Sequence, residues 1–225
     1  MKPLATIFLL LALSAGAQSA WTGIDFYPGF NYFQVTTLPG ELCSFNFPSA
    51  PAAAHYPAFL IQTNNFPISL SNCTVTATFH LECSPGAMLR FGGQGSWNFG
   101  TLPPSARFYL ATVTGYDNEG PATNYWFNSS SVELSTNTGT ATINASLAPG
   151  TGWSDGQGGS DTNAFANATT NVMEIGMAFG GGWYYDIGCA MATGTTGSAS
   201  FHLLRFAIFP PNTIAPSPPQ NLSAQ

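Results

Sequence analysis

The chain has 225 residues, of which only 6% are charged, and its 4 Lys and Arg against 10 Asp and Glu give a formal net charge of −6. Binding to nucleic acid or to an anionic membrane surface needs clustered cations that neutralise phosphates, so this composition excludes both kinds of partner. The single lysine, Lys2, lies at the N-terminus, so the rest of the chain has no lysine for Schiff-base chemistry.

The N-terminal segment has the pattern of an export signal. Lys2 precedes an apolar run from Leu4 to Leu13, and small residues follow as far as Ala20. This order is typical of a secretory signal peptide, and the apolar run is too short to cross a bilayer, which takes about 20 residues. The sequence therefore predicts a signal peptide over residues 1–19, a secreted extracellular protein and no transmembrane segment.

Apolar and polar residues alternate in the segments predicted to be strands. The clearest strand runs from Cys73 to Cys83, with Val75, Ala77, Phe79 and Leu81 on one face. In a later strand, Met173, Ile175, Met177 and Phe179 are predicted to point inward. Strands are predicted at 32–38, 42–47, 58–62, 73–83, 88–91, 106–114, 124–127, 138–147, 173–179 and 198–209, and a short helix only at 161–170.

These segments define a fold class and a domain division. Many strands separated by Gly, Pro and Asn clusters predict an all-β protein, an antiparallel β-sandwich of the jelly-roll type. The size is that of one domain, predicted over residues 20–209. Five prolines make 210–225 a Pro-rich linker or tail.

Four cysteines remain after the signal segment, at positions 43, 73, 83 and 189. An even number in a secreted chain predicts two disulfides. Cys73 and Cys83 end one continuous strand, so about 33 Å separates them, whereas a disulfide needs Cα atoms within about 7 Å. Two of the three possible pairings remain, and the one favoured is Cys43–Cys73 with Cys83–Cys189. A zinc site is the alternative, but no C-x-x-C pair supports it.

Several separated segments resemble a known group of proteins. They are Thr78-Phe79, Arg107-Phe108-Tyr109, Tyr125-Trp126-Phe127, Asn171 to Gly182 (NVMEIGMAFGGG), Gly188-Cys189 and Ser200-Phe-His-Leu203. Together they resemble the strands of secreted bacterial jelly-roll proteins of the galactose-binding-like and laminin-B-like kind. The resemblance spans roughly residues 70 to 209, and it implies a β-sandwich that binds a ligand outside the cell.

One motif and one pair of acids are candidates for catalytic groups. Gly152-Trp-Ser-Asp-Gly156 fits the G-x-S-x-G pattern, but a glycine-rich loop follows it, and the strand-to-helix turn that the mechanism needs is missing. Asp117 and Glu119 share a turn and do not have the placement that aims two carboxylates across a groove. We therefore predict no catalytic residue, and the interpretation leans away from an enzyme.

Metal binding has few candidate ligands. Asp155 and Asp161, with nearby carbonyl groups, are candidates for a structural calcium ion, which takes oxygen ligands in loops. No other cofactor is predicted. His80 and His202 each lie on a strand face and are interpreted as solvated or hydrogen-bonded residues.

Aromatic residues beside loops are the strongest indication of a ligand. Rings of this kind present an apolar face together with a polar edge, which suits a sugar ring, and an uncharged polar surface suits a neutral ligand. The alternative for each residue, and for Trp126 and Trp97 in particular, is a place in the core. The candidate ligand-binding residues are Trp97, Tyr116, Asp117, Trp126, Trp153, Trp183, Tyr184 and Tyr185.

The sequence therefore predicts a secreted, non-catalytic module that binds carbohydrate or another extracellular polymer. One alternative is a structural or adhesive surface protein that associates with itself. The other is a polysaccharide-cleaving enzyme on the same scaffold.

Overall fold

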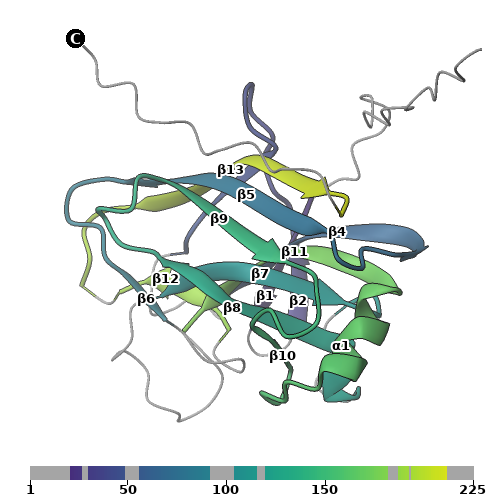
Figure 1. Cartoon of the computed structure of the whole chain (residues 1–225). Coiled ribbons are helices and arrows are strands. Elements are labelled where there is room, and N and C mark those ends of the chain that lie inside the picture. Colours follow the sequence, from purple (N-terminus) through teal and green to yellow (C-terminus); the bar gives the residue numbers. More distant parts are fainter. Residues whose placement is uncertain are drawn as a thin grey trace, which may run out of the picture.

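The computed structural model describes residues 21–26, 30–48, 56–91, 104–115, 120–181, 187–192 and 194–211, and their strands form two antiparallel sheets packed face to face (Figure 1). The predicted all-β antiparallel β-sandwich is confirmed. The predicted signal peptide 1–19 and most of the predicted tail 210–225 lie outside the described residues. Among the residues that are described, no helix is long and apolar enough to cross a membrane.

The larger sheet has seven strands in the order β10-β8-β7-β11-β4-β1-β2. They are β1 (Thr22–Phe26), β2 (Phe30–Phe33), β4 (Tyr56–Ile68), β7 (Ser105–Ala111), β8 (Tyr125–Glu133), β10 (Trp153–Asp155) and β11 (Val172–Gly180). The smaller sheet has the order β3-β13-β5-β9, with β3 (Cys43–Asn46), β5 (Thr74–Cys83), β9 (Thr140–Ser146) and β13 (Ala199–Phe209). Strands β6 (Leu89–Phe91) and β12 (Cys189–Met191) form a separate pair.

The four-stranded sheet follows the alternation of its sequence. In β5 every second residue from Val75 to Leu81 is buried against the seven-stranded sheet, and the threonines between them face outward. The outward side chains bond across the strands, because Thr76 pairs with Asn144 at 2.7 Å and Thr78 with Thr142 at 3.0 Å. One face of this sheet is therefore core, and the other is a polar surface of hydroxyl and amide groups along β5 and β9, with the exposed acid Glu82 near one end of β5.

The seven-stranded sheet is buried on both faces at its centre. One face of β11 packs in the sandwich core through Ile175, Met177 and Phe179, as predicted, whereas Met173, also predicted to point inward, is only half-buried next to a register irregularity. The opposite face carries a second apolar cluster, in which Phe59 and Tyr109 are fully buried. The strand predicted at 173–179 is thus β11, but it does not alternate between core and solvent, because a central strand with a second cluster above it has no solvent face.

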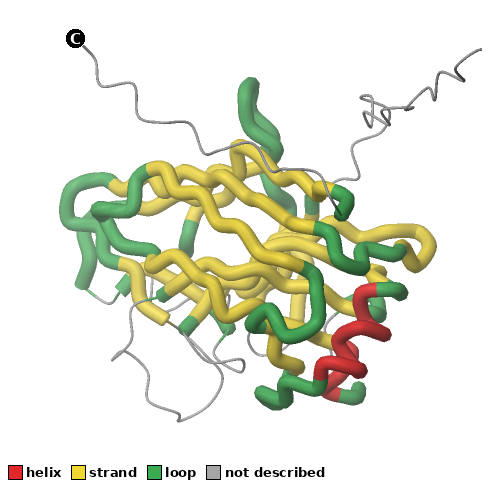
Figure 2. The backbone as a smooth tube through the Cα atoms, in the orientation of Figure 1, coloured by secondary structure: helices red, strands yellow, loops and turns green. Residues whose placement is uncertain are grey.

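The only α-helix among the described residues is α1 (Thr162–Thr169), which stands at one end of the sandwich (Figure 2). The predicted helix at 161–170 is confirmed, and the Asp161 carboxylate caps it by accepting hydrogen bonds from the N–H groups of Asn163 and Ala164. A 3₁₀ turn, η1, covers Ala122–Asn124. The G-x-S-x-G segment, interpreted as a loop, contains the edge strand β10, which pairs with β8.

The predicted disulfides are wrong, because all four cysteines are free thiols in the structure. β5 is continuous up to Cys83, so the exclusion of a Cys73–Cys83 bond is confirmed. The Cys43–Cys73 pairing fails on register. Cys43 lies opposite Leu203, which lies opposite Phe79, and Phe79 is about 20 Å along β5 from Cys73. The second predicted pair, Cys83–Cys189, is also unbonded: Cys83 pairs with Ala199 in the smaller sheet, whereas Cys189 belongs to β12.

Candidate functional site

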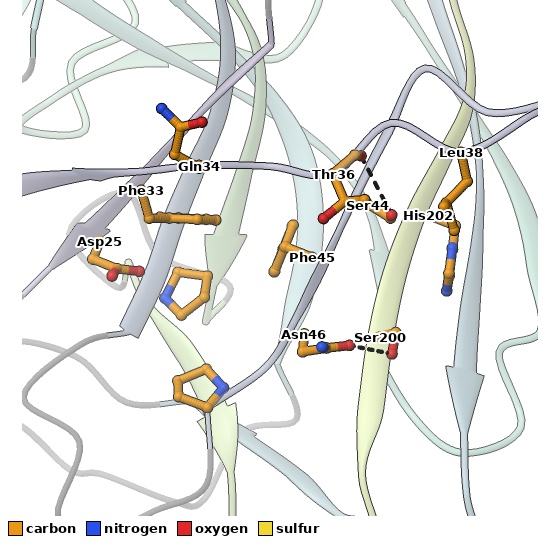
Figure 3. Close-up of a pocket in the computed structure, with 12 residues that line it drawn as sticks. Asp25, Phe33, Gln34, Thr36, Leu38, Ser44, Phe45, Asn46, Ser200 and His202 are labelled. Carbon is orange, nitrogen blue, oxygen red and sulfur yellow. Dashed lines mark hydrogen bonds between the residues drawn. The ribbon is translucent and has the colours of Figure 1, made fainter.

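A pocket of about 410 Å³ opens where the edges of the two sheets meet at β2 and β3 (Figure 3). We call it the β2–β3 pocket. Its walls come from five strands and from the segment that joins β2 to β3. It is lined by Asp25, Phe33, Gln34, Thr36, Leu38, Ser44, Phe45, Asn46, Pro48, Pro57, Ser200 and His202.

The segment between β2 and β3 is held against β3 by backbone hydrogen bonds. Thr36 and Ser44 exchange two such bonds, at 2.9 and 2.7 Å. The segment then turns at Gly40, whose φ of +89° is the left-handed conformation that glycine adopts without strain. Glu41 follows this turn. This fold-back places Gln34, Thr36 and Leu38 along one wall of the pocket.

The lining combines amide and hydroxyl groups with aromatic carbon, and it also includes the acid Asp25 and His202. Asn46 accepts a hydrogen bond from the Ser200 hydroxyl at 2.7 Å, a contact drawn in Figure 3. Phe33 and Phe45 pack edge to face with their ring centroids 5.5 Å apart. No lysine or arginine is among the described residues of the lining. Such a site suits a neutral, hydroxyl-rich ligand better than an anion.

Two further hollows adjoin the pocket through shared residues. One, of about 280 Å³, shares Phe33 and Gln34 with it and is also lined by Tyr32. The other, of about 400 Å³, shares His202. Tyr32 is 66% exposed and Leu38 is 46% exposed. The β2–β3 edge thus carries adjoining depressions beside an exposed aromatic ring.

His202 lies between two carboxylates at the border of two hollows. Its Nδ1 is 2.8 Å from Glu41 Oε2, and its Nε2 is 3.4 Å from Glu82 Oε2. The contact with Glu41 ties the β2–β3 segment to β13. His202 therefore supports one wall of the β2–β3 pocket.

The arrangement around His202 does not form a nucleophilic pair. The Ser44 hydroxyl donates to the carbonyl of Thr36, and the Ser200 hydroxyl donates to Asn46. Neither serine bonds to the imidazole, whose Nε2 faces Glu82 instead. A serine–histidine mechanism needs that contact.

β13 and β5 bring His202 opposite His80, with ring centroids 6.2 Å apart. His80 Nδ1 bonds to the Thr140 hydroxyl at 3.0 Å, in agreement with the interpretation of the two histidines as hydrogen-bonded strand residues. Within the described ranges, no group of three His, Cys, Asp or Glu side chains is placed to hold a metal ion.

The two acids named for calcium serve the backbone in separate places. Asp155 Oδ1 accepts hydrogen bonds from the N–H groups of Gln157 and Gly159, both at 2.8 Å. Asp161 caps α1. Each carboxylate therefore has a local structural role, and a calcium ion at these acids stays a prediction.

Two of the predicted ligand-binding residues, Trp126 and Trp153, are in the core. Trp126 is fully buried and Trp153 is 4% exposed. Both rings pack on Phe165 of α1, at centroid distances of 5.0 and 5.2 Å, and their indole N–H groups donate to backbone carbonyls. Their faces are not open to a ligand. The other candidates, Trp97, Tyr116, Asp117, Trp183, Tyr184 and Tyr185, lie outside the described residues.

Sequence reasoning missed the residues that line the β2–β3 pocket. Asn46 and Ser200 are neighbours in the fold but 154 positions apart in the chain. Only the pairing of β3 with β13 brings them together. Tyr32 could have been selected from the sequence, because it stands at the start of a predicted strand, next to a loop, as the other aromatic candidates do.

Glu174 is a buried acid away from this pocket. Its carboxylate accepts a hydrogen bond from the Gly115 N–H at 2.6 Å, and only 1% of the residue is exposed. Burial raises the pKa of Glu174 above its ordinary value, although the hydrogen bonds from Gly115 and Thr63 act in the opposite direction. Glu174 is therefore a structural group, and its buried position disfavours the ionised form of the carboxyl group.

Comparison with known proteins adds little to this description. No family model matches the chain, and no curated protein matches it. Among solved structures, the chain is similar to a xylan-binding module, CBM15, with a TM-score of 0.39 and 11% sequence identity over 85% of this chain and 96% of that chain. At this TM-score the similarity carries no argument about a ligand. The resemblance to galactose-binding-like and laminin-B-like proteins stays a prediction beyond the β-sandwich itself.

Proposed function

We propose that the chain is a secreted, non-catalytic module that binds a neutral extracellular polysaccharide along its β2–β3 edge. The observation that carries the proposal is the lining of the β2–β3 pocket: amide and hydroxyl groups beside Phe33, with no cation among the described lining residues. Its volume of about 410 Å³ lies within the usual range for small-ligand sites, about 300 to 1,000 Å³. The adjoining hollows give room for neighbouring units of a polymer.

Tyr32 is the proposed stacking residue of this site. Its ring lies beside Gln34 in the adjoining hollow, and its exposure leaves a face for a sugar ring. Gln34 and Asn46 supply amide groups that hydrogen-bond to hydroxyls.

The aromatic residues predicted from the sequence are retained in the proposal where their placement is not described. The Ser105 hydroxyl donates to the carbonyls of Gly180 and Gly181, so the described chain ends next to 92–103 and 182–186 meet at one end of the seven-stranded sheet. Pro57 of the pocket lies at that same end, because its strand neighbour Phe59 pairs with Ala178. Trp97, Trp183, Tyr184 and Tyr185 are therefore proposed as further ligand contacts, and Tyr116 and Asp117 remain candidates.

The test is depletion of the purified chain from solution by a panel of insoluble neutral polysaccharides. We expect Tyr32→Ala to weaken retention roughly tenfold, which corresponds to about 1.4 kcal/mol, and Tyr32→Phe to retain binding. Met88→Ala is the matched control, because Met88 is also a large apolar residue, is 62% exposed and lines none of the three hollows. Equal retention of wild type and Tyr32→Ala would refute this site, and no retention by any polymer would refute the proposed function.

The supernatants of the same depletion assay also test the alternative that the chain is a polysaccharide-cleaving enzyme. New reducing ends in the supernatant would show cleavage, and their loss in Asp117→Asn or Glu119→Gln would assign it to those acids. Retention without new reducing ends supports the binding module.

A further inference from the structure

The longest edge strand of the two main sheets is β9, which lies at the edge of the four-stranded sheet opposite β3. The edge strands β10, β2 and β3 have three or four residues each, whereas β9 has seven. Its sequence, TATINAS, contains neither a charged residue nor a proline. Natural sheets protect a long edge with charges, prolines or bulges. β9 has none of the three.

The register of β9 on β5 fixes which backbone groups face the open edge. Residues that exchange hydrogen bonds alternate with residues that do not in an antiparallel pair. At one end, the Leu81 N–H donates to the carbonyl of Gly139, so odd-numbered residues of β9 bond to β5. The N–H and C=O groups of Thr140, Thr142 and Asn144 therefore point outward. No residue in the described ranges forms a hydrogen bond with these backbone groups.

The open stretch has a defined end. The carbonyl of Ser146 also points outward, but it accepts hydrogen bonds from the Trp153 indole and from the Thr151 hydroxyl, both at 2.7 Å. Three residues, Thr140, Thr142 and Asn144, thus remain available for another strand.

We infer that β9 pairs antiparallel with β9 of a second copy of this chain, around a two-fold axis at Thr142. In this register Thr142 lies opposite the partner's Thr142, and Thr140 lies opposite the partner's Asn144. All outward backbone groups of the three residues are then bonded. An interface of this kind is isologous and closes as a dimer.

The side chains of β9 are complementary to themselves in this register. The pairs across the axis are threonine with threonine and threonine with asparagine. The structure already contains both pairs between β5 and β9, in Thr78 with Thr142 and in Thr76 with Asn144. No charges face each other, so no repulsion opposes the pairing.

This dimer is independent of the proposed function, because the β2–β3 pocket lies at the opposite edge of the four-stranded sheet. Both pockets stay open. Two pockets on one particle would raise retention on a polymer by avidity.

The test is sedimentation of the full chain over a wide range of concentrations. We expect a monomer–dimer equilibrium, and Thr142→Lys should weaken dimerisation roughly tenfold or more, because two lysines would meet at the axis. Thr74→Lys is the matched control: Thr74 is an outward threonine of β5, away from the edge, and this variant should dimerise like wild type. A wild-type chain that sediments as a monomer throughout, or a Thr142→Lys variant that dimerises as tightly as wild type, overturns the inference.

A crosslink checks the register. Cα atoms of a hydrogen-bonded antiparallel pair are about 5.5 Å apart, within the disulfide range of about 4.4 to 6.8 Å. Under mild oxidation, Thr142→Cys should form a covalent dimer, and Thr74→Cys should stay unlinked. Equal crosslinking of the two variants contradicts the register.

Discussion

Among single residues, the direction of an aromatic ring decides whether it can meet a ligand. Trp126 and Trp153 adjoin turns in the sequence, as do many binding residues, yet both rings face inward onto Phe165. Tyr32 belongs to a short edge strand and faces solvent. Nearness to a turn is visible in the sequence, but the direction of the ring depends on where α1 docks. The sequence could therefore select aromatic residues near turns, but it could not separate the rings that face solvent from those that are buried.

Replacement of Trp153 should affect stability and not binding. Trp153→Ala removes a ring stacked on Phe165 and leaves the Ser146 carbonyl without its indole donor. We expect a loss of about 3 to 5 kcal/mol in the free energy of unfolding, measured by urea denaturation. Polysaccharide retention of the folded fraction should equal that of wild type. Unchanged stability with lost retention would place Trp153 in the binding site after all.

Glu174 should make stability depend on pH. Burial raises its pKa above the ordinary value of 4.5, so the folded protein keeps a proton that the unfolded chain has lost. The free energy of unfolding therefore falls as pH rises from about 4.5 through the folded-state pKa. Glu174→Gln keeps an acceptor for Gly115 and cannot ionise, so its stability profile should be flatter over this window. The comparison is urea unfolding at a series of pH values.

Glu174→Ala separates the charge from the packing. It loses the hydrogen bond with Gly115 as well as the titrating group, so it should be less stable than Glu174→Gln at every pH. A Glu174→Gln profile as steep as that of wild type would contradict the assignment.

Among strands and helices, regular patterns were predicted well and interrupted ones were not. β5 and β9 follow a clear alternation, and both lie close to their predicted bounds, as does the short helix α1. β4 runs from Tyr56 to Ile68, whereas the sequence predicted only 58–62. Pro57, Pro67 and the Asn64-Asn65 pair are typical of turns, but pairing with both β1 and β11 holds this segment extended.

The segment between β2 and β3 should depend on Glu41 for its position. Glu41→Gln weakens the contact with His202 that ties the segment to β13. If the β2–β3 pocket binds polysaccharide, we expect several-fold weaker retention with little change in melting temperature. Glu82→Gln is the control, because Glu82 is exposed and its contact with His202 is longer, and exposed pairs contribute about 0 to 1 kcal/mol. Equal effects of the two variants would rule out a specific role for Glu41.

For the whole molecule, the sheet pairings determine what the sequence could not reveal. The β-sandwich follows from composition and alternation, but the strand order does not. The β2–β3 pocket needs β3 beside β13 and β2 beside β1, and these neighbours come from distant parts of the chain. The predicted cysteine pairing failed for the same reason, because the number of cysteines does not show which residues lie opposite one another in the sheets.

The four thiols provide a measurement on the whole chain. Denatured without reductant, the protein should give four reactive thiols per chain in a colorimetric titration. In the folded state Cys43 and Cys189 should not react, since burial raises the pKa of Cys43 to about 12 and also raises that of Cys189. Cys83, which is only half-buried, should react first. Fewer than four thiols after denaturation would mean that disulfides form.

The place of β13 has a consequence for the order of events during synthesis. This strand is the last one among the described residues, yet it lies inside the four-stranded sheet, between β3 and β5. A growing chain cannot assemble that sheet until residue 209 has left the ribosome. Until then, the apolar side chains of the other strands of the sheet stay exposed to solvent. Such waiting chains are prone to aggregate and depend on chaperones. A chain that stays unfolded until residue 209 has been made is also in the extended state that a protein-translocation channel requires.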